Sequence, residues 1–402
     1  MSGKWVANGD FAGKTGVVIV REFRESDADA AHALTRLAFG GPRVRGGGPP
    51  PGWRSHVAEL DGRVAGHVGV LNYRQYFGGR AVPMGGVIGV AVDPYARGRG
   101  VAQAMLDVVI ADMRAQGQCV SALYPSVPPL YRTRGWEQAG THQRVTLPLD
   151  LLGSLPKPAV RRVIRPAGKD DLPALRAAYR AVASTVDGML DRATESFDTE
   201  NVFELDIVDL VPGQDEVLGY LTAHRPDGET LKVYDLVAAD RDTALTLLRQ
   251  LASWAGQLKE VSLRLIDPAV WDLVLPQPMW HDVNNHPWML RVIDLPAAVA
   301  ARGWPAAERM RPFAVDIEVV DEQAPWHAGR HRIVVQNGQV KCEPGGTGAV
   351  RMSARALGPW FAGSADSAAL RRAGLLDGDP TIAARLDTLT GAPRMARMAN
   401  AF

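Results

Sequence analysis

The sequence has little cysteine, no excess of one charge and no long apolar run. Its 402 residues include two cysteines, Cys119 and Cys342, which lie far apart and lack the paired spacing of a zinc site. We therefore expect no disulfide framework and no metal site, and a reducing, cytoplasmic location is the default. The 45 basic residues balance 44 acidic ones, which gives no reason to expect binding to nucleic acid or to a membrane surface.

Long hydrophobic stretches are also absent. No segment reaches the ~20 apolar residues of a membrane span, and the first residues lack the apolar core of a signal peptide. Hydrophobic residues still make up 46% of the chain, enough to build packed cores. The missing apolar stretches predict a soluble protein. At ~100–200 residues per domain, the length predicts two or three domains.

The first 150 residues show the pattern of a mixed α/β unit. β-Branched and alternating segments predict strands at 17–20, 55–60, 64–73 and 81–92, with a tight turn at Asp61-Gly62. Apolar residues on one face predict an amphipathic helix over 101–115. The glycine- and proline-rich run at 40–52 predicts a long loop, which is either a simple connection or a mobile wall over a substrate site.

This pattern restarts after the linker at 155–158. Residues 17–27 resemble 162–171, and 63–68 resemble 216–221. We interpret the similarity as an internal duplication. The second copy has no glycine between its strand and its helix, so only the first copy keeps a loop able to approach a ligand.

Residues 295–402 predict a small α+β domain. We expect strands at 315–320, 332–335 and 339–343, with a hairpin turn at Asn337-Gly338. We expect helices at 353–360, 367–372 and 381–389. The predicted domains are therefore 1–154, 155–294 and 295–402.

The segment from Val87 to Ala102 carries the features of a phosphate site. A strand ends near Val92 and a helix begins near Gly100, so unpaired N–H groups and the helix dipole face the loop between them. Its glycines allow close approach of the backbone, and two arginines add charge. The loop fits neither the Rossmann nor the P-loop pattern. The alternative is an ordinary turn with surface arginines.

The Arg-x-x-Gly-x-Ala motif after this strand resembles the acetyl-CoA signature of the GNAT acetyltransferase superfamily. A second feature of GNAT domains follows, in which Leu130-Tyr131 precedes Gly135-Trp136. Tyr131 suits a general acid, because a phenol with a pKa of ~10 can protonate a departing thiolate. The alternative is a tyrosine packed on the domain face.

Over its whole length the chain resembles the Eis (enhanced intracellular survival) family of GNAT enzymes. The resemblance rests on the motif, the degenerate second copy, the C-terminal region and local strings such as 296–304. It implies a mixed α+β fold: tandem GNAT domains, the second lacking the CoA loop, then a sterol-carrier-protein-like domain. It also implies a homo-oligomer, a hexamer.

The resemblance further assigns roles to residues. The family's cofactor-binding positions correspond to Val90, Val92, Arg97, Gly98, Arg99, Gly100, Val101, Ala102 and Ser126. Val90 and Val92 would pair with the pantetheine arm, and the loop would hold the pyrophosphate. Tyr131 would be the general acid, and the terminal carboxylate of Phe402 would act as base or orienting anion. A frayed terminus is the alternative.

Some positions depart from the family pattern. The penultimate residue is Ala401 rather than an acid, and the early loop carries Arg43 and Arg45, which disfavours a polycationic substrate. Trp53 is either an aromatic wall or a core residue. We interpret His56, His67 and His142 as structural, His327 and His331 as surface residues, and the pair His281 and His286 as no metal site.

The sequence therefore predicts an acetyl-CoA-dependent N-acetyltransferase. It would transfer acetyl directly to a primary amine of a small molecule, with an aminoglycoside or another amine-bearing antibiotic as the leading class. Two alternatives remain open: a non-catalytic protein that binds CoA or lipid, and an acetyltransferase for an amine metabolite that is not a polycation.

Overall fold

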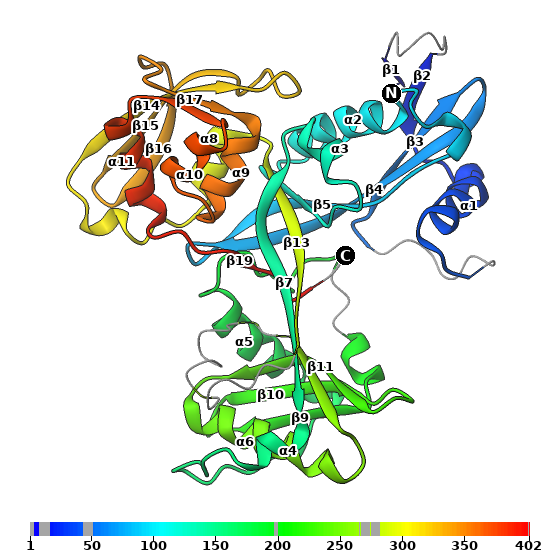
Figure 1. The fold of residues 1–402 in the computed structure, drawn as a ribbon, viewed down its shortest axis with the longest axis vertical. Coiled ribbons are helices and arrows are strands. Elements are labelled where there is room, and N and C mark those ends of the chain that lie inside the picture. The colour runs from blue at the N-terminus through cyan, green and yellow to red at the C-terminus, as the bar shows by residue number, and fades with distance from the viewer. Residues whose placement is uncertain are drawn as a thin grey trace.

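The computed structural model describes residues 4–7, 17–42, 51–196, 200–264, 266, 274, 282–400 and 402. They form three parts that meet near the middle of the molecule (Figure 1). The first two parts share one long sheet, and the third has a sheet of its own. No helix among these residues is long and apolar enough to cross a membrane.

The first part begins the long sheet and carries three helices. Its strands, in the order in which they pair, are β1 (Lys4–Ala7), β2 (Val18–Glu22), β3 (Arg54–Leu60), β4 (Arg63–Phe77), β5 (Arg80–Val92) and β6 (Val120–Leu123). Its helices are α1 (Ala28–Phe39), α2 (Val101–Ala115) and α3 (Pro128–Arg132). The predicted turn between β3 and β4 is confirmed, because Asp61 and Gly62 both have positive φ, at 53° and 76°.

The second part continues the same sheet from its other end. Its strands are β8 (Arg165–Pro166), β9 (Ile207–Pro212), β10 (Val217–His224), β11 (Thr230–Ala238) and β12 (Glu260–Arg264). Its helices include α4 (Leu149–Gly153), α5 (Leu172–Ala183) and α6 (Arg241–Ala252), with a 3-10 turn, η4 (Glu200–Glu204).

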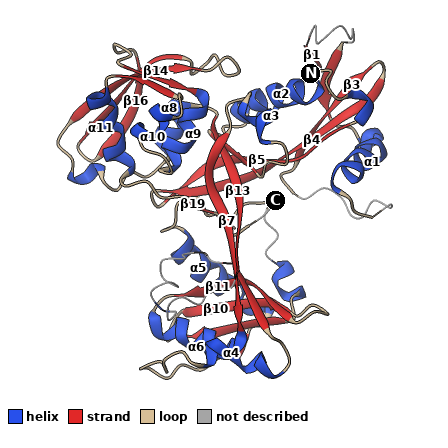
Figure 2. Ribbon diagram, in the orientation of Figure 1, coloured by secondary structure: helices blue, strands red, loops and turns tan. Residues whose placement is uncertain are grey.

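Two long strands join these parts. β13 (Asp282–Val292) lies between β6 and β7 (Glu137–Pro148), and β7 pairs with β12 through its final residues. Figure 2 shows both strands running from the first part into the second. A segment from beyond the second part therefore completes the sheet of the first. The ranges 1–154, 155–294 and 295–402 stay a prediction, because the strands interleave.

A repeated ion pair supports the duplication. Arg21 donates to both oxygens of Asp27 at 2.6 and 2.8 Å, and Arg165 donates to both oxygens of Asp171 at 2.8 and 2.7 Å. In each copy the aspartate also accepts from the backbone N–H three residues earlier, at 2.8 Å. The same contacts thus fix the start of α1 and of α5.

The third part is the expected α+β unit. Its sheet pairs β16 (Gln339–Pro344), β15 (Gly329–Gln336), β14 (Phe313–Val320), β17 (Val350–Ser353) and β18 (Leu376–Gly378). Its helices include α8 (Leu295–Ala301), α9 (Ala354–Ala362), α10 (Ser367–Arg372) and α11 (Pro380–Thr390), so the three predicted helices are confirmed. Asn337 and Gly338 form the predicted turn with φ of 52° and 73°. β17 and β18 were not predicted.

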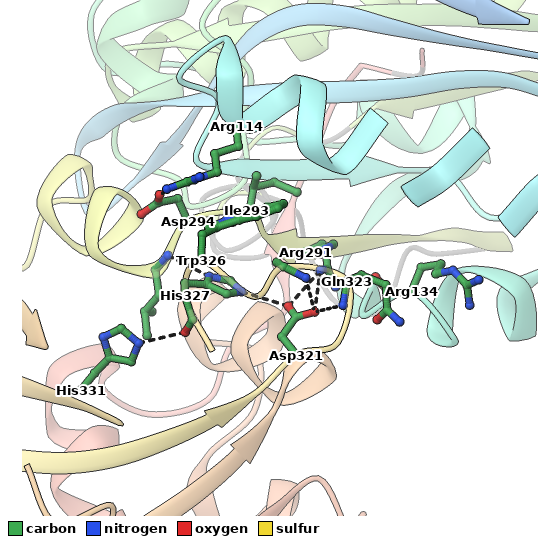
Figure 3. A network of polar contacts seen from close by, with 12 residues as sticks. Arg114, Arg134, Arg291, Ile293, Asp294, Asp321, Gln323, Trp326, His327 and His331 are labelled. Atoms are coloured by element: carbon green, nitrogen blue, oxygen red, sulfur yellow. Dashed lines mark hydrogen bonds and ion pairs between the residues drawn. The ribbon is translucent and has the colours of Figure 1, made fainter. Parts of the chain in front are cut away.

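The prediction that His327 and His331 lie on the surface is wrong. Both are buried, and His327 belongs to a polar network at the junction of the first and third parts (Figure 3). Asp321 accepts from Arg291 of β13 at 2.8 and 2.9 Å and from His327 Nε2 at 2.9 Å. The backbone N–H of Leu295 donates to His327 Nδ1, so Nδ1 is the acceptor and Nε2 the donor of the ring.

The ion pair at the centre of this network has no exposed side-chain surface. Burial raises the pKa of Asp321, but hydrogen bonds from His327 and Arg291 and the charge of Arg291 outweigh it, so the pKa lies below its ordinary value. Arg291 also donates to the backbone carbonyl of Arg134 in the first part. The network therefore ties the third part to the strand that completes the first sheet.

We predict that Arg291→Met destabilises the protein by about 3–5 kcal/mol, because it leaves a buried carboxylate without its counter-ion. A fall in the calorimetric melting temperature measures this loss. The double variant Arg291→Met with Asp321→Asn is the control, since it removes both charges and keeps acceptors for the loop N–H groups. It should melt at a higher temperature than the single variant. A single variant that melts like the wild type contradicts the prediction.

Candidate active site

The candidate site begins where two neighbouring strands separate. β5 and β6 pair only between residues 84–86 and 120–122. Beyond this point the side of β5 that faces away from β4, along Val90 and Val92, has no strand partner within the described ranges. The register of β4 and β5 also shifts next to Gly89, which has a φ of 60°. Such a bulge redirects the strand next to a site.

The loop after β5 leads into a helix whose start has no side-chain cap. Gly100 is the N-cap residue of α2 in a left-handed conformation, so the first N–H groups of the helix meet no capping side chain. Gly98 has a φ of 75°, and an added Cβ there would meet nothing within 4 Å. The helix start is therefore open to an anion.

The matching helix of the second part is closed. Asp240 is the N-cap residue of α6, and its Oδ1 accepts from the backbone N–H of Thr243 at 2.7 Å. Gly219 lies against Thr243 of α6 and Gly66 lies against Val101 of α2, so in each part a strand glycine makes room for the first turn of the helix. A carboxylate already occupies the place that a phosphate would need, and it would also repel one.

A cavity of about 550 Å³ lies beside the open helix start. The predicted cofactor-binding residues that line it are Val90, Val92, Arg97, Gly98, Gly100, Val101, Ala102 and Ser126, together with the predicted acid Tyr131. The structure thus brings residues of β5, the loop, α2 and α3 to one site. Two predicted residues, Arg99 and Phe402, are not among those that line the cavity.

Arg99 is directed to another partner. Its guanidinium forms an ion pair with Asp61 in the β3–β4 turn at 3.0 Å, and its backbone N–H donates to the carbonyl of Ala96 at 3.3 Å. In this arrangement Arg99 fixes the shape of the loop, and Arg97 is the arginine that lines the cavity.

Tyr131 lies on α3 and is 4% exposed. Burial raises the pKa of its hydroxyl above the ordinary value, and a hydrogen bond with Ser126 acts in the opposite direction. The hydroxyl is therefore protonated at neutral pH. A protonated phenol at the wall of the cavity is available to donate a proton.

The C-terminal residue is packed rather than frayed. The ring of Phe402 lies 5.3 Å from that of Tyr73 and 5.7 Å from that of Tyr124, between centroids. Tyr124 also donates to the carbonyl of Asn400 at 2.9 Å. A Cβ at Gly86 would come within 3.0 Å of the Phe402 ring, so glycine makes room for it. These contacts hold the end of the chain beside the point where β5 and β6 separate.

Trp53 and three histidines of the first part are buried or half-buried. Trp53 is half-buried, with its ring 5.6 Å from Phe23 and 6.0 Å from His67. Burial lowers the pKa of His56 and His67, and it lowers that of His142 to about 4. All three are therefore neutral at pH 7.

Several positions discussed from the sequence lie outside the described residues, namely Arg43, Arg45, His281 and Ala401. Across the ranges that are described, no group of three His, Cys, Asp or Glu side chains is placed to hold a metal ion.

Sequence reasoning missed part of the cavity wall. The additional lining residues are Ala38, Phe39, Ala96, Gln103, Val127 and Leu130. Phe39 and Val127 are each 54% exposed, so both offer apolar surface at the wall of the cavity. Apolar residues at the end of a helix and directly before Pro128 were the only available signals, and neither identifies a ligand.

Comparison with known proteins agrees with this geometry. Residues 19–139 match the GNAT acetyltransferase domain, and residues 295–398 match a sterol carrier protein domain. An uncharacterized N-acetyltransferase of Streptomyces coelicolor is 27% identical over 371 residues, which cover 79% of this chain and 81% of that protein.

Solved structures resemble almost the whole chain. A GCN5-related N-acetyltransferase from Kribbella flavida is 27% identical with a TM-score of 0.81, over 96% of this chain and 99% of that one. Eis1 from Mycobacterium abscessus has the same fold, with a TM-score of 0.75 and 21% identity over 96% of this chain and 100% of that one. The chain is thus a GNAT-superfamily N-acetyltransferase with a C-terminal sterol carrier protein domain and the architecture of Eis1, and it takes its acyl group from an acyl-CoA.

Proposed function

We propose that this enzyme transfers the acetyl group of acetyl-CoA directly to a primary amine of a small molecule. The observation that carries the proposal is the cavity in which the uncapped start of α2, the open edge of β5 and the Tyr131 hydroxyl meet. Each of these features suits a different portion of the donor.

The uncapped helix start suits the pyrophosphate of CoA. Gly98, Gly100, Val101 and Ala102 present backbone at the cavity, and Arg97 supplies a full charge. The open edge of β5 at Val90 and Val92 suits the amide groups of pantetheine, which would bond as an added strand does. Ser126 would then lie alongside the same arm.

Tyr131 is the proposed general acid. The amine nitrogen attacks the thioester carbon, and the carbon–sulfur bond breaks without an acyl-enzyme. The Tyr131 hydroxyl donates its proton to the departing sulfur, and water returns a proton to the phenolate. The raised pKa keeps this proton in place through neutral pH.

The terminal carboxylate of Phe402 is the proposed base or orienting anion. An α-carboxylate with a pKa of ~3.5 is ionised at neutral pH and can accept a proton from the attacking amine, through water. The packing of Phe402 against Tyr73 and Tyr124 supports this role, because it holds the group in one place.

Aminoglycosides and other amine-bearing antibiotics are the leading acceptor class, which would make the enzyme a resistance factor. Amine metabolites that are not polycations are the alternative. Turnover of aminoglycosides, alkylamines and arylamines, followed as release of CoA, separates the two. Absence of turnover with every amine despite binding of acetyl-CoA contradicts the proposed reaction. The proposed hexamer is tested by analytical ultracentrifugation.

We predict that Tyr131→Phe lowers kcat by about 10²–10⁴-fold, the usual contribution of a positioned general acid. Affinity for acetyl-CoA should change little, because the ring remains. Ser126→Ala is the matched control: it removes the hydroxyl that bonds Tyr131 and leaves the acid, so its kcat should fall much less. Equal kcat for Tyr131→Phe and wild type contradicts the acid role.

One glycine added after Phe402 tests the carboxylate. It moves the charge by one residue, ~3.8 Å between Cα atoms, and keeps the aromatic ring. We predict that kcat falls at least about tenfold, as expected when a proton acceptor is misplaced. The same glycine added at the N-terminus is the control. Normal turnover by the C-terminally extended enzyme refutes the role of the carboxylate.

Gly98→Asp tests the phosphate site. Aspartate tolerates a positive φ and places a negative charge beside the start of α2, as the N-cap residue Asp240 does at the start of α6. Gly98→Asn is the isosteric control without charge. We predict that the aspartate variant binds CoA about tenfold more weakly than the asparagine variant in calorimetric titration. Equal affinities of the two variants argue against phosphates at Gly98.

A further inference from the structure

A second cavity, of about 210 Å³, lies within the second part of the molecule. It is bounded by α5, η4, β10, β11 and β12, and by Asn400 of the C-terminal segment. It shares no lining residue with the cavity beside α2. It is therefore a separate site, and the proposed acetyl transfer gives it no role.

One side of this cavity is apolar. The aliphatic residues that line it are Leu172, Leu175, Val202 and Leu205, from α5 and from η4 and its end. Cavities that hold drug-sized ligands have volumes of about 300–1,000 Å³. A cavity smaller than these suits a compact apolar body, such as a single ring or a short branched chain.

The opposite side carries a buried ion pair. Both terminal nitrogens of Arg192 donate to Asp235, with Nη2 to Oδ1 at 2.8 Å. The Tyr220 hydroxyl donates to the same carboxylate at 3.0 Å. Asp235 is the only acidic residue that lines the cavity among the described residues, and these contacts engage both of its oxygens.

Arg264 lines the same side without a carboxylate of its own. Its Nε donates to the carbonyl of Tyr234 at 2.8 Å, and its Nη1 donates to the carbonyl of Ala399 at 2.7 Å. Its guanidinium lies 4.7 Å from the centroid of the Tyr234 ring. Within the described part of the chain, no carboxylate forms an ion pair with it. The opposing charge of Asp235 is already bound by Arg192, so part of the charge of the Arg264 guanidinium stays uncompensated.

Neighbouring arginines add to this excess. The guanidinium of Arg144 lies 5.4 Å from the centroid of the same Tyr234 ring, and it donates to the hydroxyl of Ser262. Burial, and then the charges of Arg192 and Arg144, lower the pKa of Arg264 to about 10 despite the opposing charge of Asp235. Arg192 and Arg264 therefore share the charge of one carboxylate, that of Asp235.

We propose that this second cavity binds a small carboxylate with a compact apolar body. The carboxylate pairs with Arg264, and the body lies against the aliphatic side formed by α5 and η4. A planar carboxylate matches the planar guanidinium, and it supplies the negative charge that the cavity lacks. The proposal does not depend on the identity of the acetyl acceptor.

The test measures the melting temperature of the full chain with saturating CoA, so that the first cavity is filled. The probes are benzoate and phenylacetate, compared with benzamide and phenylacetamide, which have the same shape without the charge. We expect the carboxylates to raise the melting temperature and to bind roughly tenfold more tightly than the amides. Sodium chloride at equal ionic strength is the solvent control.

Two variants locate the effect. Val202→Trp fills the cavity and leaves its charges, and Arg264→Gln removes the charge and leaves a donor. Both should lose the rise caused by benzoate while keeping the rise caused by CoA, which shows that they fold. Glu204→Trp, at an exposed position of the same turn, should keep both.

Three results overturn the proposal. The first is that no carboxylate raises the melting temperature of the wild type. The second is that the amides raise it as much as the carboxylates. The third is that either the Val202→Trp or the Arg264→Gln variant keeps the full response to benzoate.

Discussion

The insertion of β13 between β6 and β7 is the constraint on which the arrangement of this enzyme depends. Residues 289–292 complete the sheet of the first part, although the whole second part separates them from it in sequence. Arg291 in the same strand forms the buried ion pair with Asp321 of the third part. One strand thus closes the catalytic sheet, aligns the second part through β7 and anchors the third.

The two copies of the repeated unit differ in how the start of one helix is capped. The Arg21–Asp27 and Arg165–Asp171 pairs show that the first helix of each copy begins in the same way. In the first copy Gly100 leaves the N–H groups of α2 open, and in the second the carboxylate of Asp240 satisfies one of them on α6. A side-chain cap stabilises a helix by about 1 kcal/mol. The first copy lacks this stabilisation, as expected if a ligand takes the place of the cap.

Local features of the sequence predicted local structure well. The helix at 101–115 and the turns at Asp61-Gly62 and Asn337-Gly338 follow from periodicity and from residues that tolerate positive φ. Non-local pairing was not predictable: nothing in 282–292 indicates that β13 joins the first sheet. The direction of a side chain was equally hidden. Arg99 pairs with Asp61 across 38 positions, and His327 is buried because Asp321 and Leu295 offer matching partners.

The last residues of the chain contact both the first and the second part. Ala399 is held by Arg264 of the second part, and Asn400 is held by Tyr124 of the first. Phe402 then packs against Tyr73 and Tyr124 of the first part. A terminal segment has high conformational entropy unless both sides restrain it. The second part supplies one of these restraints, so it helps to hold Phe402 beside the strands of the first part.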